Sequence, residues 1–150
     1  MRGYKRIENI KIGDIVLSYN ETFKKNEYSE VLQTMIHDTT EEIYSLYIEN
    51  EILRATGIHK FLITRNDKEQ WLMASELSVG DLVHFANLTY HKITKIDIAI
   101  ESRTVYNFEV SGNHNYYVGK NRILAHNKGG GGGGGSAKPH TASVTGPKLE

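Results

Sequence analysis

Cysteine is absent from this 150-residue sequence. Disulfides, cysteine-ligated zinc and thiol nucleophiles within the chain are therefore excluded. Net charge is lacking as well, because 18 lysines and arginines balance 18 aspartates and glutamates. A nucleic-acid or membrane-surface binder would usually carry a basic excess. No apolar run is long enough to cross a bilayer, and no signal peptide opens the sequence. We therefore expect neither a nucleic-acid nor a membrane partner.

Helical periodicity is missing too, since no segment keeps it over three turns. Residues 4–125 instead consist of short runs rich in Val, Ile, Thr, Tyr and Phe, separated by polar or glycine-containing turns such as residues 65–70. This pattern predicts a compact all-β domain large enough to bury its own core. The expected strands are residues 14–20, 28–36, 42–49, 51–56, 59–64, 81–86, 92–100, 104–110 and 115–118.

An internal repeat runs through this β region. The stretch YKRIENIKIGDIV (residues 4–16) aligns without gaps on WLMASELSVGDLV (residues 71–83), so that one Gly-Asp pair falls on the other. Two copies of an apolar turn that leads through Gly-Asp into a strand indicate a duplicated fold with a pseudo-two-fold axis. In the second copy a further strand, HKFLIT, precedes the repeat. The same spacing in the first copy would start before Met1, so we expect the domain to begin one strand late.

The composition changes sharply after Asn127. Seven glycines begin at Gly129 and are followed by SAKPHTASVTGPKLE, which predicts a flexible linker and a disordered flank. We therefore divide the chain into a domain of residues 1–127 and a linker with flank of residues 128–150. The flank also has the length and threonine placement of a strand joined through the glycines, as in a circular permutation. Pro139 and His140 suit a strand poorly, so a downstream flank is favoured.

Three blocks resemble the Hint superfamily, the hedgehog/intein autoprocessing domains. TVYNFEVSGNHNYYVGKNRILAHN is similar to the C-terminal signature of that family, ATGIHKFLIT to its Thr-x-x-His block, and YKRIENIKIGDIVLSYN to the stretch after its first strand. The resemblance covers residues 3–127 and implies an all-β, horseshoe-shaped fold. The sequence of these blocks is similar to that of bacterial intein-like domains, including those that precede toxin modules. A bacterial secreted or cell-surface protein is therefore an expected host, although the compartment stays open.

The resemblance also implies site residues. In the family, the positions of Thr56 and His59 assist rearrangement of the peptide bond at a cysteine or serine on the first strand, and the C-terminal signature supplies His114, His126 and Asn127. Two departures bear on the activity: the sequence starts after that nucleophile, and Lys128 stands where a splicing intein has Cys, Ser or Thr. The resemblance thus implies a C-terminal reaction, with Thr56 and His59 a disused half-site unless a separate peptide supplies the strand.

The chemistry of Asn127 is independent of the resemblance. Its side-chain amide can attack its own backbone carbonyl, close a succinimide and expel the amine of Lys128. Proximity favours the attack, and histidine can transfer protons near neutral pH. We expect His126 and His114 to serve, because adjacent antiparallel strands would bring them to one end of the sheet. The predicted activity is single-turnover cleavage of the Asn127–Lys128 bond by a monomer that needs no cofactor and acts on its own flank.

Two other functions stay open. One is a processing-deficient scaffold that binds a complementary strand and acts only when the missing nucleophile segment is supplied. The other is a metal-binding β domain that uses some of the seven histidines, but their positions show no close ligand spacing. We therefore predict no metal site. Asn107 falls where many relatives carry an acidic or thiol residue, and the sequence assigns it no role.

Overall fold

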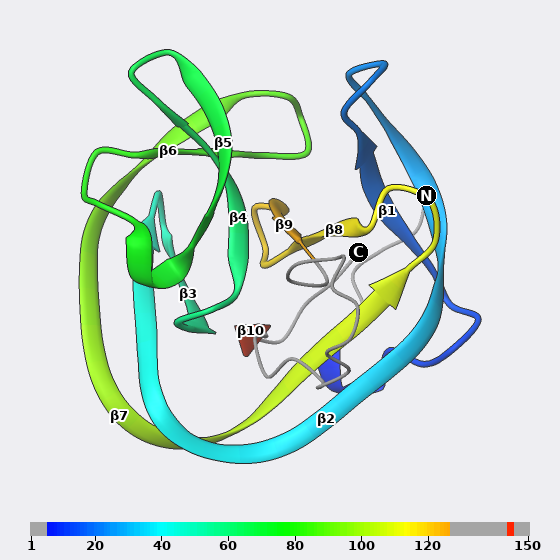
Figure 1. The fold of residues 1–150 in the computed structure, drawn as a ribbon, viewed down its shortest axis with the longest axis horizontal. Coiled ribbons are helices and arrows are strands. Elements are labelled where there is room, and N and C mark those ends of the chain that lie inside the picture. Colours follow the sequence, from blue (N-terminus) through cyan, green and yellow to red (C-terminus); the bar gives the residue numbers. More distant parts are fainter. Residues whose placement is uncertain (1–5, 127–143, 146–150) are drawn as a thin grey trace.

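The computed structural model describes residues 6–126 and 144–145. These residues are almost entirely β, as predicted, and form one antiparallel sheet that bends into a horseshoe (Figure 1). Two short 3₁₀ turns, η1 and η2, are the only helical elements in the described part of the chain, and neither could span a membrane. The strands are β1 (Ile15–Asn20), β2 (Lys25–Ile48), β3 (Glu51–Thr56), β4 (Lys60–Arg65), β5 (Lys68–Met73), β6 (Leu82–His84), β7 (Tyr90–Val110), β8 (Asn115–Val118), β9 (Ile123–His126) and β10 (Val144–Thr145), with η1 at Ile7–Asn9 and η2 at Ala74–Glu76.

A long ribbon of β2 and β7 forms the frame of the horseshoe. The two strands pair from Val31–Val110 to Ile48–Ile93, with irregularities near both ends. Figure 1 shows them curving together around the inner strands β4, β8 and β9. The sequence predicts two separate strands within each of these long strands. No glycine or proline interrupts them, however, so backbone pairing continues through the polar residues between the apolar runs.

The hairpin of β4 and β5 departs from the sequence prediction. Residues 65–70 are expected to be a turn, whereas the turn itself is only Asn66–Asp67, and β5 begins at Lys68. Both turn residues have positive φ, 54° and 64°, as a two-residue hairpin of type I′ requires. Asparagine and aspartate tolerate this conformation well. The polar residues that follow therefore pair as a strand.

The predicted internal repeat is visible in the backbone. The glycine of each Gly-Asp pair adopts a positive φ, 95° at Gly13 and 101° at Gly80. Each glycine N–H donates to a carbonyl of the long ribbon, Val31 in the first copy and Ile93 in the second, both at 2.8 Å. An L side chain would be strained in this conformation. The η1 and η2 turns precede the two glycines at equivalent positions, which completes the pseudo-two-fold duplication.

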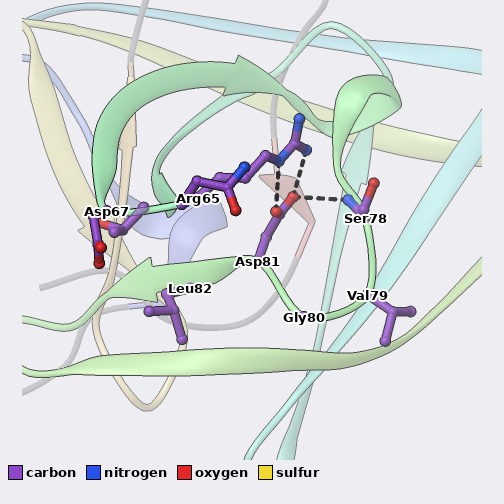
Figure 2. Close-up of a pocket in the computed structure, with 9 residues that line it drawn as sticks. Arg65, Asp67, Ser78, Val79, Gly80, Asp81 and Leu82 are labelled. Atoms are coloured by element: carbon purple, nitrogen blue, oxygen red, sulfur yellow. Dashed lines mark hydrogen bonds and ion pairs between the residues drawn. The ribbon is translucent and has the colours of Figure 1, made fainter.

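The aspartates of the repeat close the two turns. The Asp14 carboxylate accepts from the backbone N–H of Lys11, and the Asp81 carboxylate accepts from that of Ser78. Asp81 additionally receives two 2.8 Å hydrogen bonds from the Arg65 guanidinium (Figure 2). Burial opposes ionisation of Asp81, but Arg65 and the backbone donor outweigh it, so the pKa of Asp81 lies below its usual value. The second turn is thus locked by a bidentate ion pair.

The core has two parts. The larger one fills the horseshoe with side chains from β2, β4, β7, β8 and β9, including Phe61, Phe108 and Tyr116. The smaller one contains Tyr117 and Leu124 on the other face of β8 and β9. Both faces of the β8–β9 hairpin are therefore covered by apolar side chains. This burial fixes the hairpin that carries the C-terminal signature.

The flank contains one described element. Its composition predicts no regular structure, whereas Val144–Thr145 form β10, antiparallel to both β3 and β7. Figure 1 shows β10 between these two strands. Edge strands carry unpaired backbone groups, and a third strand satisfies them. The division of the chain at residue 127 stays a prediction.

Candidate functional site

The candidate site is built around His126, the last residue of β9. In the antiparallel pairing, His126 lies opposite Asn115 of β8 on one side and opposite Lys60 of β4 on the other. The His126 side chain is half-buried. Pairing on both sides fixes the backbone at the point where the chain passes on to Asn127.

His114 lies at the same end of the β8–β9 hairpin. It directly precedes Asn115, the register partner of His126, and has a positive φ of 58°. The prediction that antiparallel strands bring the two histidines to one end of the sheet therefore holds for their backbone positions. Their catalytic roles stay a prediction.

The Asn115 side chain anchors this end of the hairpin. Its Oδ1 accepts from the backbone N–H of Tyr19 at 2.8 Å, and its Nδ2 donates to the Tyr19 carbonyl at 3.0 Å. Asn115 is fully buried. The side-chain amide thus reproduces a backbone pairing and ties β8 to β1. Sequence reasoning missed this residue, although a buried asparagine at the start of the apolar strand NYYV is a signal that it has a partner.

Thr56 and His59 enclose the turn between β3 and β4. Both are buried, with exposed fractions of 0% and 1%. The His59 N–H donates to the Thr56 carbonyl at 3.2 Å, and the His59 carbonyl accepts from the Ala74 N–H at 2.8 Å. Gly57, between them, has its carbonyl bonded to the Ser75 N–H. The η2 turn therefore holds the whole Thr-x-x-His segment in place.

The His59 ring faces an aromatic environment. Its centroid lies 5.2 Å from that of Phe61 and 6.5 Å from that of Tyr116. The Tyr116 hydroxyl donates to Asn107 Oδ1 at 3.4 Å, and the same oxygen accepts from the Phe108 N–H. Burial raises the pKa of Tyr116, so the phenol stays protonated as a donor. Asn107, to which the sequence assigns no role, is thus the buried acceptor behind the ring that contacts His59.

The Thr-x-x-His segment and the C-terminal histidines come together at the start of β4. His59 directly precedes Lys60, and Lys60 is paired with His126. Trp71 of β5 adds an edge-on ring contact to His126, with 5.1 Å between centroids. The Trp71 indole N–H is 3.3 Å from each carboxylate oxygen of Glu21. Long-range strand pairing brings these residues together, so no local motif predicts the contribution of Trp71.

Asn127 and Lys128, the predicted scissile bond, lie outside the described residues. Within residues 6–126 and 144–145, no group of three or more His, Asp or Glu side chains is arranged to hold a metal ion.

Comparisons with known proteins agree with this geometry. The family of pretoxin HINT domains matches residues 1–129. The chain is similar to the solution structure of a bacterial intein-like domain from Clostridium thermocellum, with 27% identity and a TM-score of 0.73, over 85% of this chain and all of that one. It is also similar to the gp41-1 intein, with 29% identity and a TM-score of 0.62, over 83% of this chain and 94% of that one.

One curated protein is similar in sequence. An uncharacterized protein of Methanocaldococcus jannaschii, MJ0043, is 30% identical over 108 residues. This alignment covers 54% of the present chain but only 14% of the relative. The chain therefore corresponds to a small part of that protein.

Proposed function

Because the chain belongs to the family of pretoxin HINT domains, we propose that it cleaves its own backbone between Asn127 and Lys128. The Hint fold supports autocatalytic processing in general. The proposal adds the bond that breaks, the cyclisation that breaks it and the flank, residues 128–150, that is released. Its substrate is the polypeptide that the domain itself carries.

The position of His126 is the observation that supports the proposal. β9 ends at His126, which is paired on both sides with Asn115 and Lys60. The next residue in the sequence is Asn127. A backbone held on both sides limits the positions open to the residue that follows. Such restriction favours an intramolecular attack, which needs the reacting groups held in a near-attack geometry.

The reaction balances without an external reagent. The Nδ2 nitrogen of Asn127 forms a bond to the backbone carbonyl carbon of the same residue, and the bond from that carbon to the Lys128 nitrogen breaks. Nδ2 loses one proton, and the Lys128 nitrogen gains one and leaves as an amine. The products are residues 1–127 with a terminal succinimide and the free flank. No water is consumed in this step.

Two proton transfers limit the reaction. The amide nitrogen becomes a better nucleophile as its proton leaves, and the Lys128 nitrogen becomes a better leaving group as it is protonated. A positioned acid or base contributes about 10²–10⁴-fold to such a step. His126 and His114 lie at the same end of the β8–β9 hairpin. We assign these transfers to the two histidines.

Intact-mass spectrometry of the purified chain over days near pH 7 tests the proposal. Two products are expected. Their masses should at first sum to that of the precursor, because cyclisation adds no water, and the product of residues 1–127 should then gain the mass of one water as its succinimide hydrolyses. Asn127→Ala should keep the precursor mass throughout, while Asn9→Ala, which changes an exposed asparagine, should react like the parent. A parent chain whose mass never changes, or equal cleavage in Asn127→Ala, contradicts the proposal.

A second candidate function is the scaffold that binds a complementary strand without processing. One observation favours it: β3 and β7 both pair with a third strand, β10. A chain with this function alone would show the same unchanged mass with and without Asn127→Ala. The mass experiment therefore separates the two candidates.

A further inference from the structure

Four strands of the sheet form a closed circuit. β2 pairs with β3 along Ile43–Ile48 and with β7 along most of its length. β10 pairs with β3 on one side and with β7 on the other. The strand order therefore returns to its start through β2, β3, β10, β7 and β2 again. In this circuit β10 is the strand that comes last in the chain.

The gap that β10 fills has the width of one strand. Val144 is paired with Ala55 of β3 and also with Tyr106 of β7. Since β10 is antiparallel to both, β3 and β7 run parallel to each other at this point. Each offers backbone groups toward the gap, and an extended peptide satisfies such groups from both sides.

The walls of the gap suit a close-fitting backbone. Ala55 has a small side chain and is fully buried. The residues that follow the two wall positions, Thr56 and Asn107, are buried as well. A strand in this gap therefore lies beside the Thr-x-x-His turn rather than on an outer surface of the horseshoe.

We propose that the gap between β3 and β7 is a strand-binding site, and that its occupant is this chain's own segment Val144–Thr145. The segment reaches the site through residues 127–143, which at full extension span roughly 60 Å. Two paired residues form few backbone hydrogen bonds. The covalent connection keeps the local concentration of the segment high, and this compensates for the short pairing.

A consequence follows for the proposed cleavage, and it rests on that proposal. When the Asn127–Lys128 bond breaks, the connection is lost and the occupant becomes a separate peptide. A pairing of two residues does not hold a free peptide at micromolar protein concentration. Cleavage thus opens the gap. The docking of the intact chain does not depend on whether cleavage occurs.

The absence of cysteine from the chain allows a test by disulfide trapping without background. In an Asn127→Ala chain, which keeps the connection intact, one variant carries Ala55→Cys with Val144→Cys and another carries Arg54→Cys with Thr145→Cys. Adjacent antiparallel pairs alternate between the wider and the closer spacing, so one of the two opposed pairs has the geometry that a disulfide needs.

The matched control pairs Arg54→Cys with Leu149→Cys, which moves the second cysteine four residues along the flank. At least one opposed pair is expected to oxidise about tenfold faster than this control, as measured by the mass loss of two hydrogens. Equal rates in all three variants would overturn the proposal.

Hydrogen exchange gives a second test that leaves the walls of the gap unaltered. Val144→Pro removes a backbone N–H from the segment, while Leu149→Pro makes the same change outside the described pairing. Amides of residues 51–56 and 104–108 should exchange about tenfold faster in Val144→Pro than in Leu149→Pro. If both segments exchanged at the same rate in Val144→Pro as in Leu149→Pro, that result would contradict docking. A third test uses the cleaved parent chain. If the released flank still co-eluted with residues 1–127 in size-exclusion chromatography, that result would contradict release.

Discussion

Asn115 and His126 face each other across the β8–β9 pair, and the side chain of Asn115 is bonded to both backbone groups of Tyr19. The first strand of the described sheet is thus connected to the last residue of β9 through one buried amide. Tyr19 and Asn115 are 96 residues apart in the chain, so no sequence motif contains both of them. The candidate site therefore includes a long-range contact that lies outside its sequence motifs.

Replacement of Asn115 should therefore loosen the site. Asn115→Leu keeps the approximate size but leaves the N–H and C=O of Tyr19 buried without their partner. Each unsatisfied group costs about 1–3 kcal/mol, so a loss of about 2–6 kcal/mol in the free energy of unfolding is expected in urea denaturation. Asn9→Ala, at an exposed position, should change it by less than about 0.5 kcal/mol. A stability equal to that of the parent would show that the amide contributes nothing.

The histidines of the hairpin should control the rate of cleavage. His126→Ala and His114→Ala are each expected to slow the appearance of the succinimide product by about 10²–10⁴-fold, the usual contribution of a positioned acid or base. His37→Ala, on the long ribbon, should cleave at the parent rate. Time courses by intact mass compare the variants. Parent-like cleavage in His114→Ala would remove that residue from the mechanism.

His84 should make stability depend on pH. Its side chain is buried against Tyr19, Tyr117 and Tyr90, and neither ring nitrogen has a hydrogen-bond partner among the described residues. Burial, with a smaller contribution from the Lys24 charge, lowers the pKa of His84 from 6.5 to about 4.

The unfolded chain therefore binds the His84 proton at a higher pH than the folded one. The contribution to stability is full above pH 6.5 and is lost as the pH falls from there toward 4, by about 3 kcal/mol in total. Urea denaturation between pH 7 and 4 measures this loss. His84→Phe should lose about 3 kcal/mol less over the same range. Equal pH dependence in both chains would mean that His84 is not the group that titrates.

The ion pair of Arg65 and Asp81 should matter more than a pair at the surface. Asp81 is 4% exposed and the Arg65 side chain 35%. Arg65→Met leaves the carboxylate buried without its main partner, and we expect a loss of about 1–3 kcal/mol after allowance for the partial exposure of Arg65.

The matched control is Arg103→Met. Arg103 pairs with Glu101, and both side chains are about one third exposed, so removal of this pair should cost less than about 1 kcal/mol. Thermal unfolding of the two variants beside the parent gives the comparison. A larger effect at Arg103 would contradict the assignment of Arg65 as the residue that locks the second turn.

Much of the fold follows from local pattern. Alternating apolar runs predict the β class, and the two Gly-Asp turns predict the duplication, because their glycines need a conformation that other residues avoid. The continuity of β2 and β7 was beyond local pattern. Residues 37–41 of β2 contain no fully buried side chain, and they stay in the strand because a partner strand runs beside them. Pairing over long sequence distances leaves no local trace in composition.

The candidate site likewise contains residues that the sequence motifs predict and residues that only the strand pairing reveals. The order of motifs locates Thr56, His59, His114 and His126. It does not locate Trp71, whose contact with His126 comes from the pairing of β4 with both β5 and β9. Nor does composition predict β10. Valine and threonine favour strands, but a run of two residues is too short to predict one, and the strands on either side set the conformation of Val144 and Thr145.

The closed circuit of strands has a consequence for the order of folding. Synthesis proceeds from the N-terminus, so Val144 and Thr145 are made after the nine other described strands. Val144 must then find Ala55, 89 positions earlier in the chain (144 minus 55). Closure of the circuit therefore waits for the strand that is made last, and it adds a contact of long sequence separation to the sheet. A nascent chain would pass through a stage in which the domain is folded but the circuit is still open.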